Sequence, residues 1–191
     1  MRFYPAMNFI WNLQFVICNF SKTFSGLKTL LLIRHAKSSW DDPGLSDFDR
    51  PLNERGKKDA PMMADRLHER GIKLDAFISS PAKRAKRTAE QFAKRYKKED
   101  KDIILKTELY MAIENTFYEV IEKLDDNDDC IALFSHNPGL TDFANSLTEV
   151  RTDNIPTCGI FAVSIDIKKW NKIREAKKNL LFFDYPKASV E

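Results

Sequence analysis

The sequence predicts an α/β protein with a mostly parallel central sheet and helices on both faces of that sheet. One indication is the continuous apolar run Leu30 to Ile33, which has no polar alternation and is typical of a parallel strand buried on both faces. A second run of this kind covers Cys130 to Phe134. Segments with apolar residues at helical spacing lie between the apolar runs, so strands and helices alternate along the chain.

Length and composition indicate one well-packed domain, which we expect over residues 27–191 of the 191-residue chain. The formal net charge is only +3, which does not favour a nucleic acid as partner. The three cysteines, Cys18, Cys130 and Cys158, have no metal-ligand spacing and cannot all pair with one another. This pattern is typical of a reducing compartment, and we expect a cytoplasmic protein.

Residues 1–26 differ from the rest because they are rich in Phe, Trp, Asn and Ser and carry little charge. Their apolar part, Phe9 to Phe20, contains three side-chain amides and is too short and too polar to span a bilayer, so we expect no membrane partner. We expect a disordered or loosely docked leader, or translated sequence upstream of a true start near Leu27. A targeting role is the less favoured alternative, because the segment matches the cleavage-site pattern of a signal peptide poorly.

The first predicted strand is followed by a long surface loop, because residues 38–52 are dense in Asp, Pro and Gly. Asn53 is a suitable N-cap for the next helix, whose apolar residues keep helical spacing until Gly71 ends it. The short apolar run Ala76 to Ile78 then predicts a second strand.

A basic helix follows this second strand. Ser80 is a suitable N-cap and Pro81 a suitable first residue, so the helix is predicted to run from there to about Tyr96. Arg84 would lie in its first turn, where a cation is unfavourable unless it faces an anion. Arg84 is therefore a candidate ligand of phosphate or carboxylate. The other basic residues are interpreted as a solvated helix face rather than a nucleic-acid stripe.

The remaining chain predicts further strands and helices in alternation. Asn137 and Pro138 repeat the cap-and-proline start of the basic helix and place His136 at a strand end beside a helix N-terminus. The expected strands are Ile103–Leu105, Cys130–Phe134, Ile160–Ile167 and Asn179–Phe183, and the expected helices are Asn115–Leu124 and Thr141–Leu147.

Polar side chains follow three of these strands at their carboxyl ends, where ligands of parallel sheets collect. They are Arg34, His35, Arg84 and His136. Two guanidinium groups and a helix N-terminus form a pocket for a dianionic tetrahedral group such as phosphate. One histidine can attack phosphorus through a neutral ring nitrogen while the other stabilises charge on the phosphoryl oxygens. A zinc site is disfavoured, because a catalytic zinc takes three protein ligands and Arg34 would oppose metal binding.

Several segments of the chain stand together in a specific order and spacing. They are Leu32-Ile33-Arg34-His35-Ala36, Asp49-Arg50-Pro51-Leu52-Asn53-Glu54-Arg55-Gly56, Ser79-Ser80-Pro81 with Arg84-Ala85 and Thr88-Ala89-Glu90, and Ser135-His136-Asn137-Pro138. This set resembles the histidine phosphatase superfamily, which has the phosphoglycerate mutase-like fold. Within that superfamily the chain is most similar to the small SixA-type phosphohistidine phosphatases. The resemblance covers residue 27 to the C-terminus.

The resemblance implies a three-layer sandwich and a metal-independent phosphatase. His35 would be the nucleophile that becomes phosphorylated, and Arg34 and Arg84 would hold the phosphoryl oxygens. His136 would complete the pocket and stabilise the transition state. Water would then hydrolyse the phosphohistidine and release inorganic phosphate, and no metal or organic cofactor is implied. Ala36 departs from the glycine that many members have after the catalytic histidine.

The general acid has two candidates in this pattern. Larger relatives place Glu or Asp after the third strand to protonate an alcohol leaving group, and here Glu108 is the nearest match and Glu114 the second. A solvated carboxylate is an equally good interpretation of both. Imidazole leaving from a P–N bond has a pKa of about 6.5 and needs no strong acid, so we expect protein phosphohistidine as substrate. The alternatives are a phosphatase of a small phosphorylated metabolite or sugar, and a catalytically idle phosphate-binding module.

Overall fold

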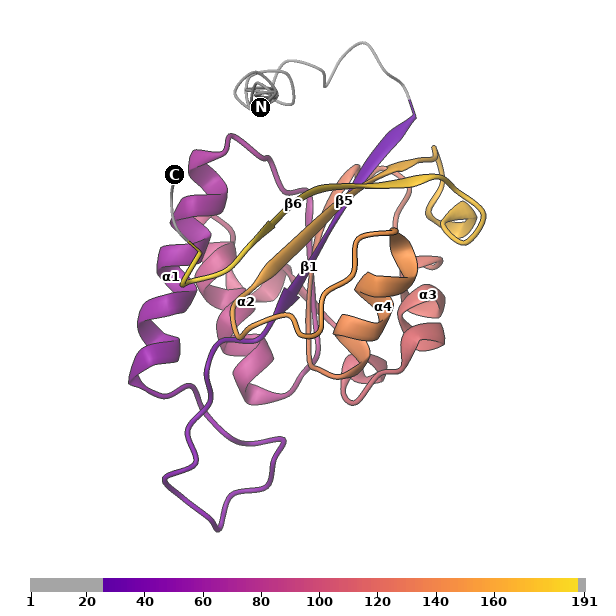
Figure 1. The fold of residues 1–191 in the computed structure, drawn as a ribbon. Coiled ribbons are helices and arrows are strands. Elements are labelled where there is room, and N and C mark those ends of the chain that lie inside the picture. The colour runs from indigo at the N-terminus through magenta and orange to yellow at the C-terminus, as the bar shows by residue number, and fades with distance from the viewer. Residues whose placement is uncertain (1–25, 189–191) are drawn as a thin grey trace, which may run out of the picture.

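Six strands form one central sheet in the computed structural model, which describes residues 26–188 (Figure 1). The strands are β1 (Leu27–Arg34), β2 (Ala76–Ser79), β3 (Ile103–Leu105), β4 (Cys130–Ser135), β5 (Ile160–Asp166) and β6 (Lys178–Asp184). Their order is β3-β2-β4-β1-β5-β6. The first four of these are mutually parallel, whereas β5 runs antiparallel to both β1 and β6. The mostly parallel sheet is therefore confirmed. The leader predicted over residues 1–26 lies, apart from Gly26, outside the described residues.

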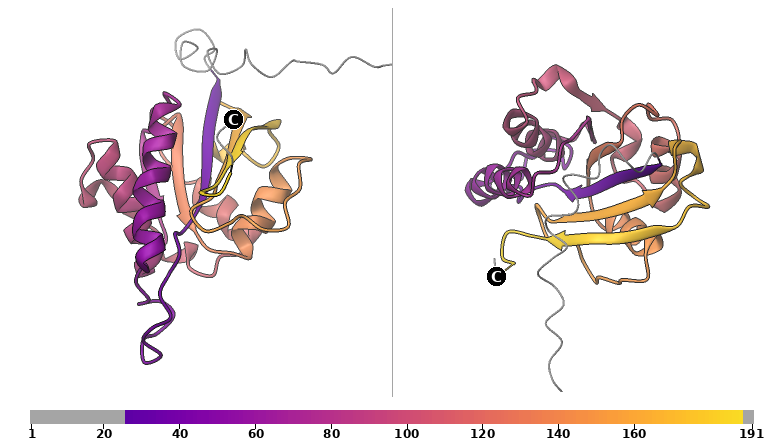
Figure 2. Two further views of the ribbon diagram at one scale, coloured as in Figure 1. Left: turned by 60° about the vertical axis from the view of Figure 1, so that its left-hand side comes forward. Right: turned by 90° about the horizontal axis from the view of Figure 1, so that it is seen from above.

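Helices cover both faces of this sheet, which confirms the three-layer sandwich (Figure 2). Helices α1 and α2 lie on one face, and α3 and α4 lie on the other. Their bounds are α1 Glu54–Glu69, α2 Lys83–Arg95, α3 Glu114–Ile121 and α4 Gly139–Leu147, and single-turn 3-10 helices lie at Asp100–Asp102, Thr107–Leu109 and Trp170–Lys172. Within residues 26–188 the helices are too short or too polar to cross a membrane.

The apolar run of β1 contributes to the core on both sides of the sheet. Leu30 and Leu32 pack in the cluster that contains the apolar side chains of α3 and α4. Leu31 and Ile33 pack in the cluster that contains those of α1 and α2. All four side chains are fully buried. A strand covered on both faces has no polar side to present to water, which explains why its sequence shows no alternation.

The loop that follows β1 is anchored at the start of α1. Asn53 is the N-cap of this helix, as predicted, and its side chain accepts a 2.9 Å hydrogen bond from the Gly56 amide. Gly71 follows the helix end with a positive φ of 73°, a conformation that favours glycine. Between β1 and α1, residues 38–52 extend beyond the carboxyl end of β1 (Figure 1).

Two predicted helix starts are wrong. Helix α2 begins at Lys83 with Ala82 in the N-cap position, so Ser80 lies outside the helix and its hydroxyl is available for another partner. Helix α4 begins at Gly139, and Pro138 rather than Asn137 occupies the N-cap position. In both cases the proline lies before the helix instead of in its first turn.

The register of the central strands aligns the predicted site residues. Arg34 at the end of β1 is paired with Ser135 at the end of β4. Ser79 at the end of β2 is paired with Phe134 of β4. The residues that come next in the three segments therefore leave the sheet at one edge, and they are His35, Ser80 and His136.

Candidate active site

His35 leaves the end of β1 as a buried side chain that is only 8% exposed. Its Nδ1 lies 2.8 Å from the carbonyl oxygen of Ala36, which can only accept, so Nδ1 carries the proton. Nε2 is then unprotonated and accepts a 3.2 Å hydrogen bond from Nε of Arg84. Burial, supported by the charges of Arg84 and Arg34, lowers the pKa of His35 to about 3. The ring is therefore neutral near neutral pH and can act as a nucleophile through Nε2.

His136 leaves the end of β4 beside His35, and the two ring centroids are 5.0 Å apart. Its Nε2 lies 2.9 Å from Oγ of Ser80. Its Nδ1 is buried and has no hydrogen-bond partner among the described residues. Burial lowers the pKa of His136 to about 2, with further contributions from His35 and Arg84. The second ring is therefore neutral as well, so its tautomer decides which nitrogen can donate.

Arg34 is anchored through one arm of its guanidinium. Nη1 donates to the side-chain oxygen of Asn154 at 3.0 Å and to the carbonyl oxygen of Ile155 at 2.7 Å. Nε is buried without a hydrogen-bond partner in the described part of the chain. Burial and the charge of Arg84 lower the pKa of Arg34, but a guanidinium stays protonated near neutral pH. Arg34, the residue directly before His35, thus holds a fixed positive charge beside it.

Arg84 lies in the first turn of α2 and faces an anion, as predicted, but this anion is part of the protein. Nη2 donates a 2.8 Å hydrogen bond to the carboxylate of Asp47, and Nη1 donates to the Asp47 carbonyl oxygen. The hydroxyl of Tyr110 donates to the same carboxylate at 3.0 Å. These hydrogen bonds lower the pKa of Asp47, although its partial burial acts in the opposite direction. Asp47 is therefore ionised near neutral pH.

A cavity of about 190 Å³ opens at this edge of the sheet. Ligand pockets commonly measure about 300–1,000 Å³, so this one is suited to a phosphoryl group and little of its carrier. Its lining has four cationic side chains and one carboxylate, and consists of Arg34, His35, Lys37, Ser38, Trp40, Asp47, Arg50, Arg84 and Thr157. Within residues 26–188 no group of three or more His, Cys, Asp or Glu side chains is arranged to hold a metal ion.

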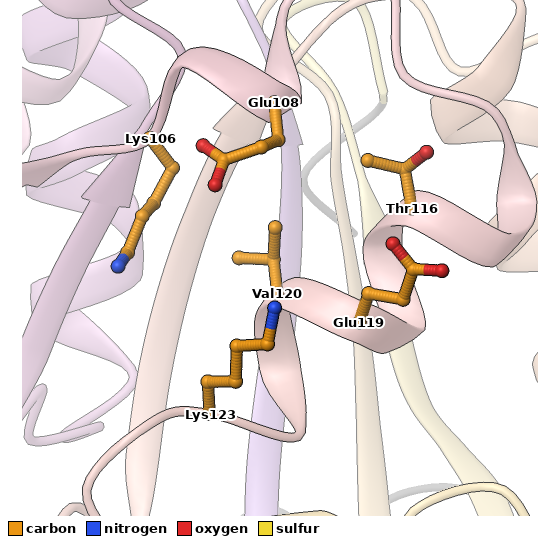
Figure 3. A pocket seen from close by; sticks show the side chains of 6 residues that line it. All are labelled: Lys106, Glu108, Thr116, Glu119, Val120 and Lys123. Atoms are coloured by element: carbon orange, nitrogen blue, oxygen red, sulfur yellow. The ribbon is translucent and has the colours of Figure 1, made fainter.

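Glu108, which is predicted as the general acid, lies in a different pocket from His35. That pocket measures about 30 Å³ and is lined by Lys106, Glu108, Thr116, Glu119, Val120 and Lys123 (Figure 3). The physical reason is the 3-10 turn at Thr107–Leu109. Leu109 is fully buried in this turn and its carbonyl oxygen accepts from Ser135, so the neighbouring Glu108 is exposed. Glu114, the second choice, is exposed at the start of α3.

Sequence reasoning missed Asp47 and Tyr110 as parts of this site. The density of turn residues marks a loop around Asp47 but does not indicate where the loop folds back. The structure also explains Thr88, which in the sequence is only part of a motif. Its Oγ1 accepts a 2.9 Å hydrogen bond from the Ala36 amide and donates to the Arg84 carbonyl oxygen, so it links the backbone beside His35 to α2.

The family of the chain follows from comparisons with known proteins. The family model of the histidine phosphatase superfamily (branch 1) matches residues 30–123, which include Arg34, His35 and Arg84. An uncharacterized chloroplastic protein of Arabidopsis thaliana is 44% identical over 61 residues, 32% of this chain but only 28% of that protein. An uncharacterized protein of Mycobacterium tuberculosis is 27% identical over 165 residues, 81% of this chain and 100% of that protein.

A solved structure from Agrobacterium tumefaciens, named as a phosphohistidine phosphatase SixA, has a similar fold. It is 26% identical, has a TM-score of 0.67, and the match covers 85% of this chain and 99% of that chain. The described fold and the family match lead to one assignment: the chain belongs to the histidine phosphatase superfamily, and its fold is similar to that of SixA-type members.

Proposed function

We propose that this protein is a phosphatase that removes the phosphoryl group of protein phosphohistidine through a phosphorylated His35. The observation that carries the proposal is the unprotonated Nε2 of His35, 3.2 Å from Nε of the buried Arg84. A neutral ring nitrogen is the nucleophile that phosphoryl transfer to histidine requires. The guanidinium beside it can hold a phosphoryl oxygen as the phosphorus approaches that nitrogen.

The reaction proceeds in two transfers. The bond from the substrate nitrogen to phosphorus breaks while a bond from His35 Nε2 to phosphorus forms, and the substrate imidazole leaves as a neutral ring if its other nitrogen carries a proton. The Nδ1 proton of His35 stays on its hydrogen bond to the Ala36 carbonyl oxygen, which stabilises the positive charge of the phosphorylated ring. Water then attacks phosphorus, inorganic phosphate leaves, and Nε2 regains its lone pair.

The surroundings of the histidines support phosphohistidine over an alkyl phosphate. An alkoxide needs a proton from an acid, whereas imidazole has a pKa of about 6.5 and is readily protonated near neutrality. Glu108, the expected acid, lies in a separate pocket. Asp47 is ionised and holds Arg84, so it is poorly suited to donate a proton. The small cavity also favours a substrate that presents its phosphoryl group at the end of a protein side chain.

The experiment is a short reaction with a phosphohistidine-containing protein carrying a labelled phosphoryl group, followed by trapping under alkaline conditions. We expect acid-labile label on His35 and none in a His35→Ala variant. A His68→Ala variant is the matched control, because His68 is an exposed histidine on α1. Unchanged phosphatase activity in His35→Ala would exclude the proposed nucleophile. Faster turnover of a panel of sugar phosphates would instead identify a small phosphorylated metabolite as substrate.

We also propose that the protein works in the cytoplasm. Cys130 and Cys158 are free thiols, and Cys158 is fully buried. Free thiols are typical of a reducing compartment, which supports this location. Fractionation of cells with an antibody against the chain would test it, and recovery in an oxidising compartment would contradict it.

A further inference from the structure

Ser80 is a buried serine whose hydroxyl lies between a backbone amide and the second histidine. Its side chain is fully buried at the end of β2. Oγ accepts a 3.3 Å hydrogen bond from the Ala82 amide and lies 2.9 Å from Nε2 of His136. A serine hydroxyl can accept two hydrogen bonds but has a single proton to donate. The direction of the bond between Ser80 and His136 therefore follows from where that proton can go.

Only one direction satisfies the hydroxyl of Ser80. If Nε2 of His136 donated to Oγ, the hydroxyl proton of Ser80 would need another acceptor, and the hydrogen bonds of residues 26–188 provide none. An unsatisfied proton on a fully buried hydroxyl is costly. If Ser80 donates instead, its hydroxyl makes a hydrogen bond to Nε2 of His136 while Oγ accepts one from the Ala82 amide. The hydroxyl is then satisfied. His136 is neutral, so its single ring proton then resides on Nδ1.

We propose that Ser80 is a positioning residue that keeps the ring proton of His136 on Nδ1, so that this N–H can donate to a phosphoryl oxygen. The inference rests on the proposed phosphatase function and deepens it. Nδ1 of His136 and Nε of Arg34 are both buried and without partners among the described residues. Two unsatisfied donors on side chains that flank His35 are costly in the free protein, and a bound phosphoryl group offers the acceptors that they lack.

The inference separates the roles of the two histidines by their tautomers. His35 has its proton on Nδ1 because the Ala36 carbonyl oxygen accepts it, which leaves Nε2 as the nucleophile. His136 has its proton on Nδ1 because Ser80 donates to Nε2, which leaves Nδ1–H as the donor. Both rings thus carry their proton on Nδ1. This leaves His35 with an unprotonated Nε2 for attack and His136 with an Nδ1–H donor for charge stabilisation.

The test uses the full chain labelled with ¹⁵N-histidine, which has only three histidines. Nitrogen spectra distinguish a protonated ring nitrogen from an unprotonated one without any substrate. We expect the Nδ1–H tautomer for His136 in the wild type and a mixture of tautomers in Ser80→Ala. Ser79→Ala is the matched control, because Ser79 is also fully buried but its hydroxyl donates to the Ser80 carbonyl oxygen. This control should keep the wild-type spectrum.

Turnover gives the second readout. Loss of one neutral hydrogen bond predicts a roughly tenfold lower kcat for Ser80→Ala, with KM within about twofold of the wild type. A merely structural role would lower the melting temperature without this split between kcat and KM. The proposal is overturned if wild-type His136 carries its proton on Nε2, or if Ser80→Ala matches Ser79→Ala in kcat. The spectra need no substrate, so failure of the phosphatase function would leave the tautomer result standing.

Discussion

The carboxylate of Asp47 accepts a 2.8 Å hydrogen bond from Nη2 of Arg84, so the guanidinium expected to hold a phosphoryl group already holds an anion. Tyr110 donates to the same carboxylate, and Nη1 of Arg50 lies 3.7 Å from its other oxygen. An entering phosphoryl group carries negative charge, so it has to replace this carboxylate or share the guanidinium with it. Asp47 therefore competes with oxyanions for the site.

Asp47→Asn should bind oxyanions more tightly. The amide oxygen can still accept from Arg84 and Tyr110, whereas the repulsion between the carboxylate and an oxyanion disappears. We expect the Kd of inorganic phosphate to fall by roughly threefold to tenfold, less at high salt because half of the Asp47 side chain is exposed. Asp49→Asn is the control, since Asp49 bonds Ser46 in the same loop. Weaker phosphate binding by Asp47→Asn than by Asp49→Asn would contradict competition.

Arg84→Lys should lower kcat/KM by about 10²–10³-fold, the effect of losing a preorganised donor to a developing oxyanion. A lysine keeps the charge but has no planar fork, so it cannot serve His35 and a phosphoryl oxygen at the same time. Arg87→Lys on the same helix is the control, because Arg87 is exposed and pairs with Glu90. Steady-state kinetics on one phosphorylated substrate measure both variants. Equal activity of the two would mean that Arg84 does not hold the phosphoryl group.

The two buried histidines should make the protein less stable in acid. Burial lowers the pKa of His35 to about 3 and that of His136 to about 2, whereas a histidine in the unfolded chain has a pKa of about 6.5. Between these values the unfolded chain binds protons that the folded chain does not. The contribution of the two neutral histidines to the free energy of unfolding is thus fully present above pH 6.5. As the pH drops below this value, the contribution decreases by at most about 1.4 kcal/mol per pH unit for each histidine.

Denaturant unfolding between pH 7 and pH 4 measures this loss. A His136→Gln variant should lose less stability per pH unit than the wild type over this interval, because one of the two rings is gone. Carboxylates also contribute to the slope, and the comparison between the two proteins removes their part. A variant with the same slope as the wild type would show that His136 is not held neutral by burial.

The central sheet could be predicted because the signals that form it are local. The apolar runs of β1 and β4 need burial on both faces, and the absence of polar alternation in these runs indicates this from the sequence alone. The starts of α2 and α4 could not be predicted in the same way, because the side chains involved have partners far along the chain. Ser80 bonds His136 instead of capping a helix, and Asn137 donates to Asn154 and Ile155.

The same distinction applies to charged residues. Arg84 could be predicted as an anion ligand because its place in the first turn of a helix is a local property. Its pairing with Asp47 could not, since it depends on how the loop over residues 38–52 folds back. Lys28 is a further example. It looks like an exposed residue in the sequence, but its ammonium is buried against the carboxylate of Asp129 and the carbonyl oxygens of Asp126 and Asp128.

Gly56 links the stability of the fold to the position of the nucleophile. A Cβ at this residue would lie 2.2 Å from the carbonyl oxygen of Lys37, two residues after His35, and backbone atoms cannot move away as a flexible side chain can. Gly56→Ala should therefore lower the free energy of unfolding by roughly 2–4 kcal/mol. It should also lower kcat, because the displaced backbone carries His35.

Gly44→Ala is the control for this prediction. A Cβ at Gly44 would lie 3.2 Å from a side-chain oxygen of the exposed Asp42, which can rotate away, so we expect a change within about 0.5 kcal/mol. Denaturant unfolding and steady-state kinetics on both variants measure the two effects. If Gly56→Ala were as stable and as active as Gly44→Ala, the first turn of α1 would not pack against the backbone that follows His35. Loss of stability with unchanged kcat would instead limit the role of Gly56 to the fold, because the position of the nucleophile would then be set by the bonds of Ala36 to Thr88 and of His35 to Arg84.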